Sequence, residues 1–260
     1  MRSTFSKNTR LLFSFFLVVL NFFSSAFTPL QAKNTLPLSN KHQLKSHSVT
    51  NAYKQHQIHG WQVMISNDVK KNKPLYQRIL KQVNHDLQSI VQVMPKWSLP
   101  YLRKTPIWFE QIMPPPFNDN LFFNGSKKGS KRYNIEHLYG GVVAGSTQSY
   151  LAVANIHPWQ LLHELTHAYH QFVTRHSYQP IRNAYQNAID KNLHQFGNQY
   201  ARKNHKEYFS TLTEAYFGID ANYPHNRQQL AEHDPVGYCS VVKAWGLTGN
   251  QAADAPLKCN

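Results

Sequence analysis

Cysteine is scarce in this sequence, with two residues in a chain of 260. A structural zinc site built on cysteine needs more thiolates than the chain offers, so that kind of site is excluded. The two cysteines, Cys239 and Cys259, both lie near the C-terminus. In an exported protein, an even pair of this kind predicts one disulfide that holds the C-terminal segment. In a reducing compartment the pair would instead stay as free thiols.

Long apolar runs are missing after the first 32 residues. Within residues 1–32, three basic residues precede an apolar stretch from Leu11 to Phe27, and small residues follow it. This order is typical of a secretory signal peptide, with cleavage expected after Ala26 or Ala32. An uncleaved anchor is the alternative, because the apolar stretch is almost long enough to span a bilayer. Polar residues near its far end favour the signal peptide, which predicts a secreted or periplasmic protein with no membrane span after cleavage.

Acidic residues are also few: 13 aspartates and glutamates stand against 28 lysines and arginines, for a formal net charge of +15. Removal of the three basic residues of the signal peptide leaves 15 − 3 = +12 for the mature chain. Such a charge favours anionic partners. The basic residues are scattered, however, and no nucleic-acid-binding motif accompanies them. We therefore expect a basic, solvated surface, no nucleic-acid partner, and a monomeric mature chain.

The rest of the chain predicts one domain with an α+β fold. Residues 33–56 are polar and aperiodic, which predicts a flexible leader before a domain at 57–260. A long connection, residues 113–133, interrupts the apolar periodicity of that domain. Strands are expected at 60–69, at 105–110 and within 140–156, and helices at 75–91, 159–174, 180–203 and 205–218. A small mixed sheet followed mostly by helices is an α+β arrangement.

The pentapeptide HELTH, residues 163–167, lies within the predicted helix 159–174. Residues four apart share a helix face, so His163 and His167 can occupy two corners of a tetrahedral zinc site. Glu164 is placed to act as the general base that accepts a proton from the attacking water. The alternative is an amphipathic helix whose histidines are merely exposed. Four apolar residues are expected to bury the opposite face: Leu161, Leu165, Ala168 and Phe172.

A catalytic zinc ion needs a third protein ligand and one open position. Few carboxylates follow the HELTH motif, and two of them, Glu207 and Glu214, lie on the predicted helix 205–218. They are seven residues apart and therefore share a helix face. Spacing alone does not choose between them, and both could instead be solvent-facing charges.

The segments PWQLLHELTHAYH, AYQNAI, YARKNHKEYFSTLTEAYFG and HDPVGY resemble zinc peptidases related to the catalytic domain of anthrax lethal factor. These peptidases belong to the glutamate-zincin group, which includes Pro-Pro endopeptidases. The likeness extends to GWQVMI and PIWFE and covers about residues 58–246. It implies a zincin-like domain, one Zn²⁺ ion and a peptide or protein substrate. Through the pattern Y-x(6)-E, it also implies that Glu207 is the third zinc ligand and that Tyr200 stabilises the oxyanion or protonates the leaving group.

The sequence departs from this family at one position. Relatives commonly carry a second glutamate four residues after the ligand glutamate, where it orients a ligand histidine. This chain has Thr211 there. Either Glu214, one turn further on, takes that role, or the support is a weaker hydroxyl.

These features together predict an exported zinc metallopeptidase. We expect the segment 142–156 to provide the edge strand on which an extended substrate lies. The alternative function is a non-catalytic exported zinc-binding protein, or a toxin-like component with a degenerate peptidase fold. The intact Glu164 and Tyr200 favour the enzyme.

Overall fold

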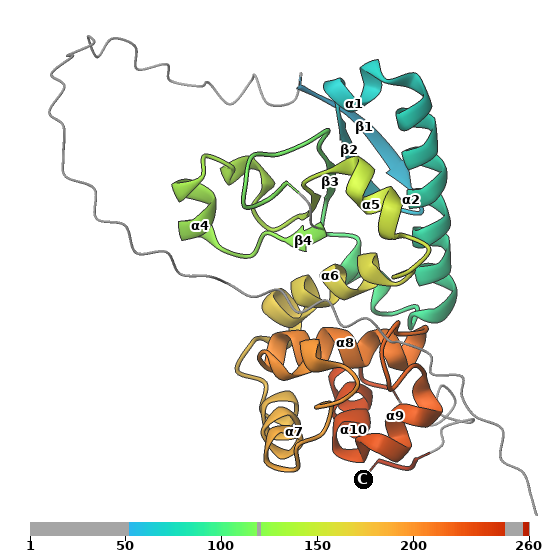
Figure 1. The fold of residues 1–260 in the computed structure, drawn as a ribbon, viewed down its shortest axis with the longest axis vertical. Helices are drawn as coiled ribbons and strands as arrows, with labels where there is room; N and C mark the ends of the chain where they lie inside the picture. The colour runs from blue at the N-terminus through green and yellow to red at the C-terminus, as the bar shows by residue number, and fades with distance from the viewer. Residues whose placement is uncertain (1–51, 119–120, 248–256, 260) are drawn as a thin grey trace, which may run out of the picture. The chain divides into compact units, whose positions relative to one another are not determined.

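The computed structural model describes residues 52–118, 121–247 and 257–259 (Figure 1). The expected signal peptide, residues 1–32, and most of the expected leader lie outside the described residues. The described residues all belong to one unit of the chain, residues 44–260. Its mixture of helices with a small sheet confirms the α+β prediction. Among the described residues, no helix is both long and apolar enough to cross a membrane.

Five short strands form one mixed sheet with the order β1-β2-β3-β5-β4. The pairs β2–β3 and β3–β5 are parallel, and the outer pairs β1–β2 and β4–β5 are antiparallel. The strands β2, β3 and β5 are almost entirely buried, which agrees with their apolar sequences. The bounds are β1 Tyr53–Ile58, β2 Trp61–Ser66, β3 Ile107–Phe109, β4 Leu121–Phe123 and β5 Val142–Ala144.

The predicted leader boundary at residue 56 is wrong, because β1 begins at Tyr53. This strand is polar and only partly buried, so its sequence carries no apolar alternation to reveal it. It is held by backbone pairing with β2 along its whole length. The two-residue turn between the strands places His59 at φ 49° and Gly60 at φ 89°. Two positive φ angles in succession are typical of the turns that close tight hairpins.

The prediction for residues 142–156 is wrong in two respects. Only Val142–Ala144 forms a strand, β5, and it lies inside the sheet, so it is not an edge that a substrate can pair with. The residues after it form the helix α5, Thr147–Val153, whose start is capped when the Ser146 side chain accepts a hydrogen bond from Ser149 N. A short apolar run fits a helix or a strand equally well, and here the cap selects the helix. The edge strand on this side of the sheet is β4, from the predicted long connection.

The helices predicted at 75–91 and 205–218 are confirmed as α2 and α8. The predicted helix 180–203 is too long, because α7 ends at Asp190 and the chain passes through positive φ angles at Asn192 and His194. The remaining part of that segment forms the short 3₁₀ turn η4. The helical elements are α1 Asn67–Lys71, α2 Lys73–Val93, α3 Leu99–Leu102, α4 Lys127–Arg132, η2 Glu136–Leu138, α5 Thr147–Val153, α6 Gln160–Tyr169, η3 His170–Thr174, α7 Gln179–Asp190, η4 Gln199–Arg202, α8 His205–Phe217, α9 Arg227–His233 and α10 Pro235–Ala244.

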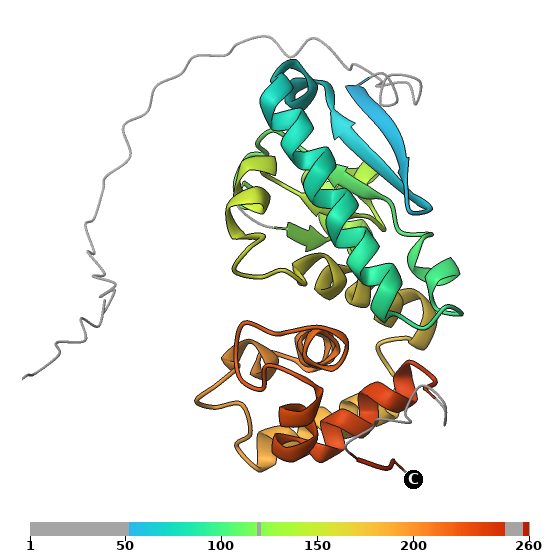
Figure 2. The same cartoon turned by 90° about the vertical axis from the view of Figure 1, so that its right-hand side faces the viewer.

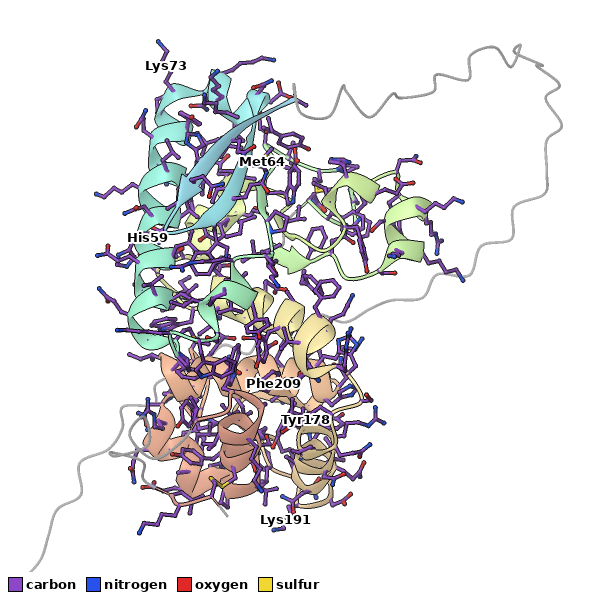
Figure 3. The ribbon with its side chains drawn as sticks, turned by 180° about the vertical axis from the view of Figure 1, so that it is seen from behind. His59, Met64, Lys73, Tyr178, Lys191 and Phe209 are labelled. Atoms are coloured by element: carbon purple, nitrogen blue, oxygen red, sulfur yellow. A yellow bond between two sulfur atoms is a disulfide. The ribbon has the colours of Figure 1, made fainter. Side chains whose placement is uncertain are left out.

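One hydrophobic core joins the sheet to the helices. The long helix α2 runs along the sheet, and α6 lies between the sheet and the helices α7 to α10 (Figure 1, Figure 2). Helix α6 packs on β4 and β5 on one side and on α8 on the other. In the side-chain view, Phe209 of α8 lies among the helices, away from Met64 of the sheet (Figure 3). Helix α6 is therefore packed between the strands β4 and β5 on one side and helix α8 on the other.

The predicted disulfide between Cys239 and Cys259 is confirmed, with an S–S distance of 2.05 Å. It joins α10 to the C-terminal residues 257–259, and Leu257 and Cys259 pack against the core.

Candidate metal centre

Helix α6 presents both motif histidines on one face. The centres of the His163 and His167 rings lie 4.8 Å apart. The other face of the helix is buried at Leu161, Leu165 and Ala168, as the sequence predicts. Phe172 does not continue this buried stripe, and its side chain is 41% exposed.

The change at Phe172 has a local cause. The chain leaves the α-helix after Tyr169 and forms a π-helical turn, η3, over His170–Thr174. A π turn contains more residues than an α turn, so the residues after it are rotated off the original face. Phe172 packs instead against the rings of Phe123 and Tyr139.

Helix α8 brings Glu207 to both histidines. Glu207 Oε2 lies 3.1 Å from His163 Nε2 and 3.0 Å from His167 Nε2. Ligand atoms at the corners of a tetrahedral zinc site are about 3.3 Å apart, since each is about 2.0–2.1 Å from the ion. Asn204 fixes the start of the helix, because its side chain accepts hydrogen bonds from Lys206 N and Glu207 N. The three ligand-type atoms therefore converge at nearly the spacing that a metal requires.

The Nδ1 atoms of both rings also contact side chains of α8. His163 Nδ1 lies 2.5 Å from Glu214 Oε1, and His167 Nδ1 lies 3.2 Å from Ser210 Oγ. The carboxylate of Glu214 accepts a hydrogen bond from Nδ1 of His163, which leaves Nε2 as the nitrogen that would bind a metal. The sequence leaves open whether Glu214 or Thr211 orients a ligand histidine. In the structure Glu214 contacts His163, and Thr211 is buried on the same helix.

Sequence reasoning missed Ser210. Its position was readable, because it follows Glu207 by three residues and precedes Glu214 by four, which places all three side chains on one helix face. Serine is common enough that this spacing alone carries little information.

Glu164 lies beside the histidines and is held by the edge strand. Its Oε2 accepts a hydrogen bond of 2.8 Å from the backbone N of Phe123 in β4. Burial raises the pKa of this carboxyl, and the two nearby histidines oppose that rise. Ligand atoms of His163, Glu164 and His167 all lie within 4.8 Å of one another, so this group could hold a metal ion.

The electrostatics of the site favour a cation. Burial alone would raise the pKa of Glu207, but its contacts with His163 and His167 lower the pKa well below the usual range. Burial alone would lower the pKa of His163, but Glu214 and the other carboxylates raise it well above its usual value. Three carboxylates around two imidazoles therefore attract positive charge, which is the environment that a divalent ion needs.

Tyr200, on η4, lies at the open side of this group. Its ring centre is 5.8 Å from that of His163, and Lys203 Nζ lies 3.7 Å from the ring centre of Tyr200. Burial raises the pKa of the phenol to about 12, and the charges of Glu207 and two other glutamates add to the rise. The phenol therefore stays protonated at neutral pH and can donate a hydrogen bond.

Two hollows flank the group, one of about 360 Å³ and one of about 570 Å³. Both are lined by Leu121, Glu164 and Tyr200. The shared residues show that the two hollows are adjacent, with His163 lining the smaller and His167 the larger, and we refer to the two hollows together as the groove.

Comparison with protein-family models, with curated proteins and with solved structures finds no match to this chain.

Proposed function

We propose that the protein is an exported zinc-dependent peptidase with a zincin-like fold, in which His163, His167 and Glu207 hold the metal. The observation that carries this proposal is the convergence of two histidine Nε2 atoms on one Glu207 oxygen, at 3.1 and 3.0 Å. Glu214 and Ser210 orient the rings from behind. Two imidazoles and one carboxylate are a donor set that suits zinc in catalytic sites.

Glu164 is assigned as the base and not as a ligand. Its carboxylate is tied to Phe123 N, whereas Glu207 contacts both Nε2 atoms directly. When bound, zinc would lower the pKa of a water molecule and polarise the carbonyl of the scissile bond. Glu164 accepts the proton of the attacking water and passes it to the departing amine, so that a C–O bond forms as the C–N bond breaks. Its raised pKa suits both steps.

Tyr200 is assigned to the developing oxyanion. Its protonated phenol donates a hydrogen bond to the carbonyl oxygen as negative charge grows there. Tyr200 lines both hollows, and its ring centre lies 5.8 Å from that of His163.

The edge strand β4 offers a surface for an extended peptide. Asn124 N donates to Gly141 O on the β5 side, so the backbone of the preceding residue, Phe123, faces the other way and meets Glu164. Backbone N–H and C=O groups alternate in direction along a strand, so those of Leu121 face the same open side as those of Phe123. Leu121 also lines both hollows. A substrate that adds a strand to β4 would pass directly beside Glu164.

The experiment measures zinc content and hydrolysis of a diverse peptide library by the mature protein. We expect one zinc ion per chain, loss of zinc in His163→Ala, and retention of zinc in Glu164→Gln. Hydrolysis by Glu164→Gln should fall by about 10²-fold to 10⁴-fold, which is typical of the loss of a general base. Glu232→Gln, at an exposed carboxylate of α9, is the matched control and should be fully active.

Bound zinc without hydrolysis of any library peptide, in a correctly folded sample, would refute the peptidase. That result would favour the non-catalytic zinc-binding alternative. Failure to bind zinc at all would refute the metal site itself.

A further inference from the structure

The two hollows beside Glu164 differ in the charged side chains that line them. The smaller one, the acidic hollow, is lined by Glu214 and Asp220 together with the amides of Asn198 and Asn222. The larger one, the basic hollow, is lined by Lys203, Lys206, His176 and Gln171. An inference about the substrate follows from this division, and it rests on the proposed function.

The acidic hollow is built from buried carboxylates. The side chains of Asp220 and Glu214 are 4% and 9% exposed. Asp220 is fixed by hydrogen bonds of 2.9 Å from Asn198 Nδ2 and 2.7 Å from Asn222 N. Burial raises the pKa of Asp220 to about 7, and the nearby charge of Glu214 adds to the rise. No lysine or arginine is among the described residues that line this hollow. Glu214 pairs there with His163, whereas Asp220 forms no salt bridge among the described residues.

The acidic hollow also has room and apolar walls for the stem of a basic side chain. Tyr150 and Val153 of α5 also line this hollow, which has a volume of about 360 Å³. Lysine and arginine side chains combine an aliphatic stem with a charged end, which matches apolar walls that lead to a carboxylate. The hollow opens beside Glu164 and Tyr200, so its occupant would lie next to the scissile bond.

The basic hollow has the reverse arrangement. Lys203 and Lys206 form no salt bridge with a carboxylate among the described residues. Its own carboxylates, Glu164 and Glu207, face the motif histidines. Burial lowers the pKa of His176 to about 4, and the charge of Lys206 adds to the fall, so His176 is neutral and the positive charge of this hollow comes from the two lysines.

We propose that the substrate carries a cationic side chain on one side of the scissile bond, bound in the acidic hollow near Asp220 and Glu214. On the other side of that bond it carries an anionic group, which is an acidic side chain or a terminal carboxylate, bound near Lys203 and Lys206. The charge pattern therefore favours only one order of the cationic and anionic residues around the scissile bond of a peptide that lies along β4. Asp220 and the two lysines are specificity-determining residues, and they take no part in the bond cleavage.

The test uses the zinc-loaded mature protein and three peptides built around one cleaved sequence. The residues flanking the scissile bond are lysine and glutamate in the first peptide, the same residues in reverse order in the second, and glutamine at both places in the third. Two readouts are measured: kcat/KM for hydrolysis, and peptide binding to zinc-loaded Glu164→Gln by fluorescence anisotropy. One order should exceed the neutral peptide by about tenfold or more, and the reverse order should be the poorest, because an unmatched buried charge is costly.

Variants separate the two hollows. Asp220→Asn should abolish the preference for lysine and leave the preference for glutamate, whereas Lys203→Gln with Lys206→Gln should do the opposite. Because the lysines are exposed, their share of the selectivity should be only a few-fold. Asp190→Asn, at the end of α7, and Lys191→Gln, directly after it, are the matched controls; Lys191 lies at the end of the helical part that is away from the sheet (Figure 3). A merely structural role for Asp220 would weaken both preferences equally.

The outcomes distinguish this inference from the proposed function. Cleavage of the neutral peptide that Glu164→Gln abolishes supports the peptidase, whatever the charges do. Equal kcat/KM for all three peptides, or a preference that Asp220→Asn leaves intact, overturns the charge inference and leaves the peptidase standing. If no peptide is cleaved, the anisotropy measurement decides: binding without dependence on peptide charge, or no binding, overturns the inference as well.

Discussion

Asp220 should make the folded protein less stable as the pH rises. Its carboxyl is 4% exposed, and burial beside Glu214 raises its pKa from 3.8 to about 7. The other charged group that acts on it is His163 of α6. Between these two pKa values the unfolded chain has lost the proton while the folded chain retains it, so unfolding releases a proton and stability falls with increasing pH. Above about pH 7 the penalty is complete and stays constant.

The substitution Asp220→Asn removes this titration. Each pH unit in the window corresponds to about 1.4 kcal/mol, and two units separate about pH 5 from the folded-state pKa, so the total is about 3 kcal/mol. The stability of the variant relative to wild type should therefore rise by about 3 kcal/mol between about pH 5 and about pH 8. The hydrogen bond from Asn198 is weakened in the variant at both pH values, so its loss of about 1 kcal/mol cancels in this difference.

The assay is urea denaturation of both proteins at the two pH values, in the presence of a chelator. A second series with zinc should show a smaller difference, because a nearby cation favours the ionised carboxylate. Asp190→Asn, at an exposed carboxylate, should show no pH-dependent difference from wild type. If the difference between Asp220→Asn and wild type is the same at both pH values, Asp220 is ionised throughout and the reasoning from burial fails.

Three further predictions concern the metal centre and the C-terminus. Glu214→Gln should weaken zinc binding by about 10-fold to 100-fold in competition with a chromophoric chelator, because it removes the charge beside His163 Nδ1; unchanged affinity would exclude this support role. Tyr200→Phe should lower kcat by about 10²-fold with zinc content unchanged, and an unaltered kcat would remove the phenol from the reaction. Replacement of Cys239 and Cys259 by serine should lower the free energy of unfolding in urea by about 3 kcal/mol, because the disulfide closes a loop with a sequence separation of 20. An unchanged free energy of unfolding would mean that removal of the disulfide adds little entropy to the unfolded chain.

The parts of the fold that the sequence predicts well are those with a long apolar period. Helix α2 has 21 residues, begins at the Asn72 cap and ends just before Pro95. Helix α8 is likewise bounded by a cap, at Asn204, and is buried over most of its length. In both cases the local signals and the tertiary packing favour the same structure, so the sequence alone is sufficient.

The parts that it predicts poorly depend on tertiary pairing. Strand β4 has three residues and lies within a segment of prolines, glycines and lysines, so no alternation marks it. It is a strand because its backbone pairs with β5, which lies about twenty residues later in the chain. Strand β1 is polar for the same reason, since it needs only its backbone to pair with β2. Edge strands bury one face or none, and so their sequences carry the weakest signal.

The same distinction between local signals and tertiary structure applies to the residues of the candidate site. His163, Glu164 and His167 are recognisable because one helix places them at fixed spacing. The resemblance to a peptidase family supplied Glu207 and Tyr200, which spacing could not select. Asp220 was not singled out, because it lies on an irregular segment that reaches the site only after the chain has folded.

The geometry of the proposed metal centre depends on one contact between helices, that of α6 with α8. Glu207, Ser210 and Glu214 follow one another at intervals of three and four, so a single face of α8 supplies the proposed ligand carboxylate and both contacts to the Nδ1 atoms of the rings. The opposite face of α8 is anchored in the core by Phe209 and Leu212, which are 0% and 1% exposed. Because the helix is rigid, any displacement of α8 would move all three polar side chains together and would weaken ligation and ring orientation at once. The buried packing of α8 is therefore as much a determinant of the proposed metal site as the HELTH motif itself.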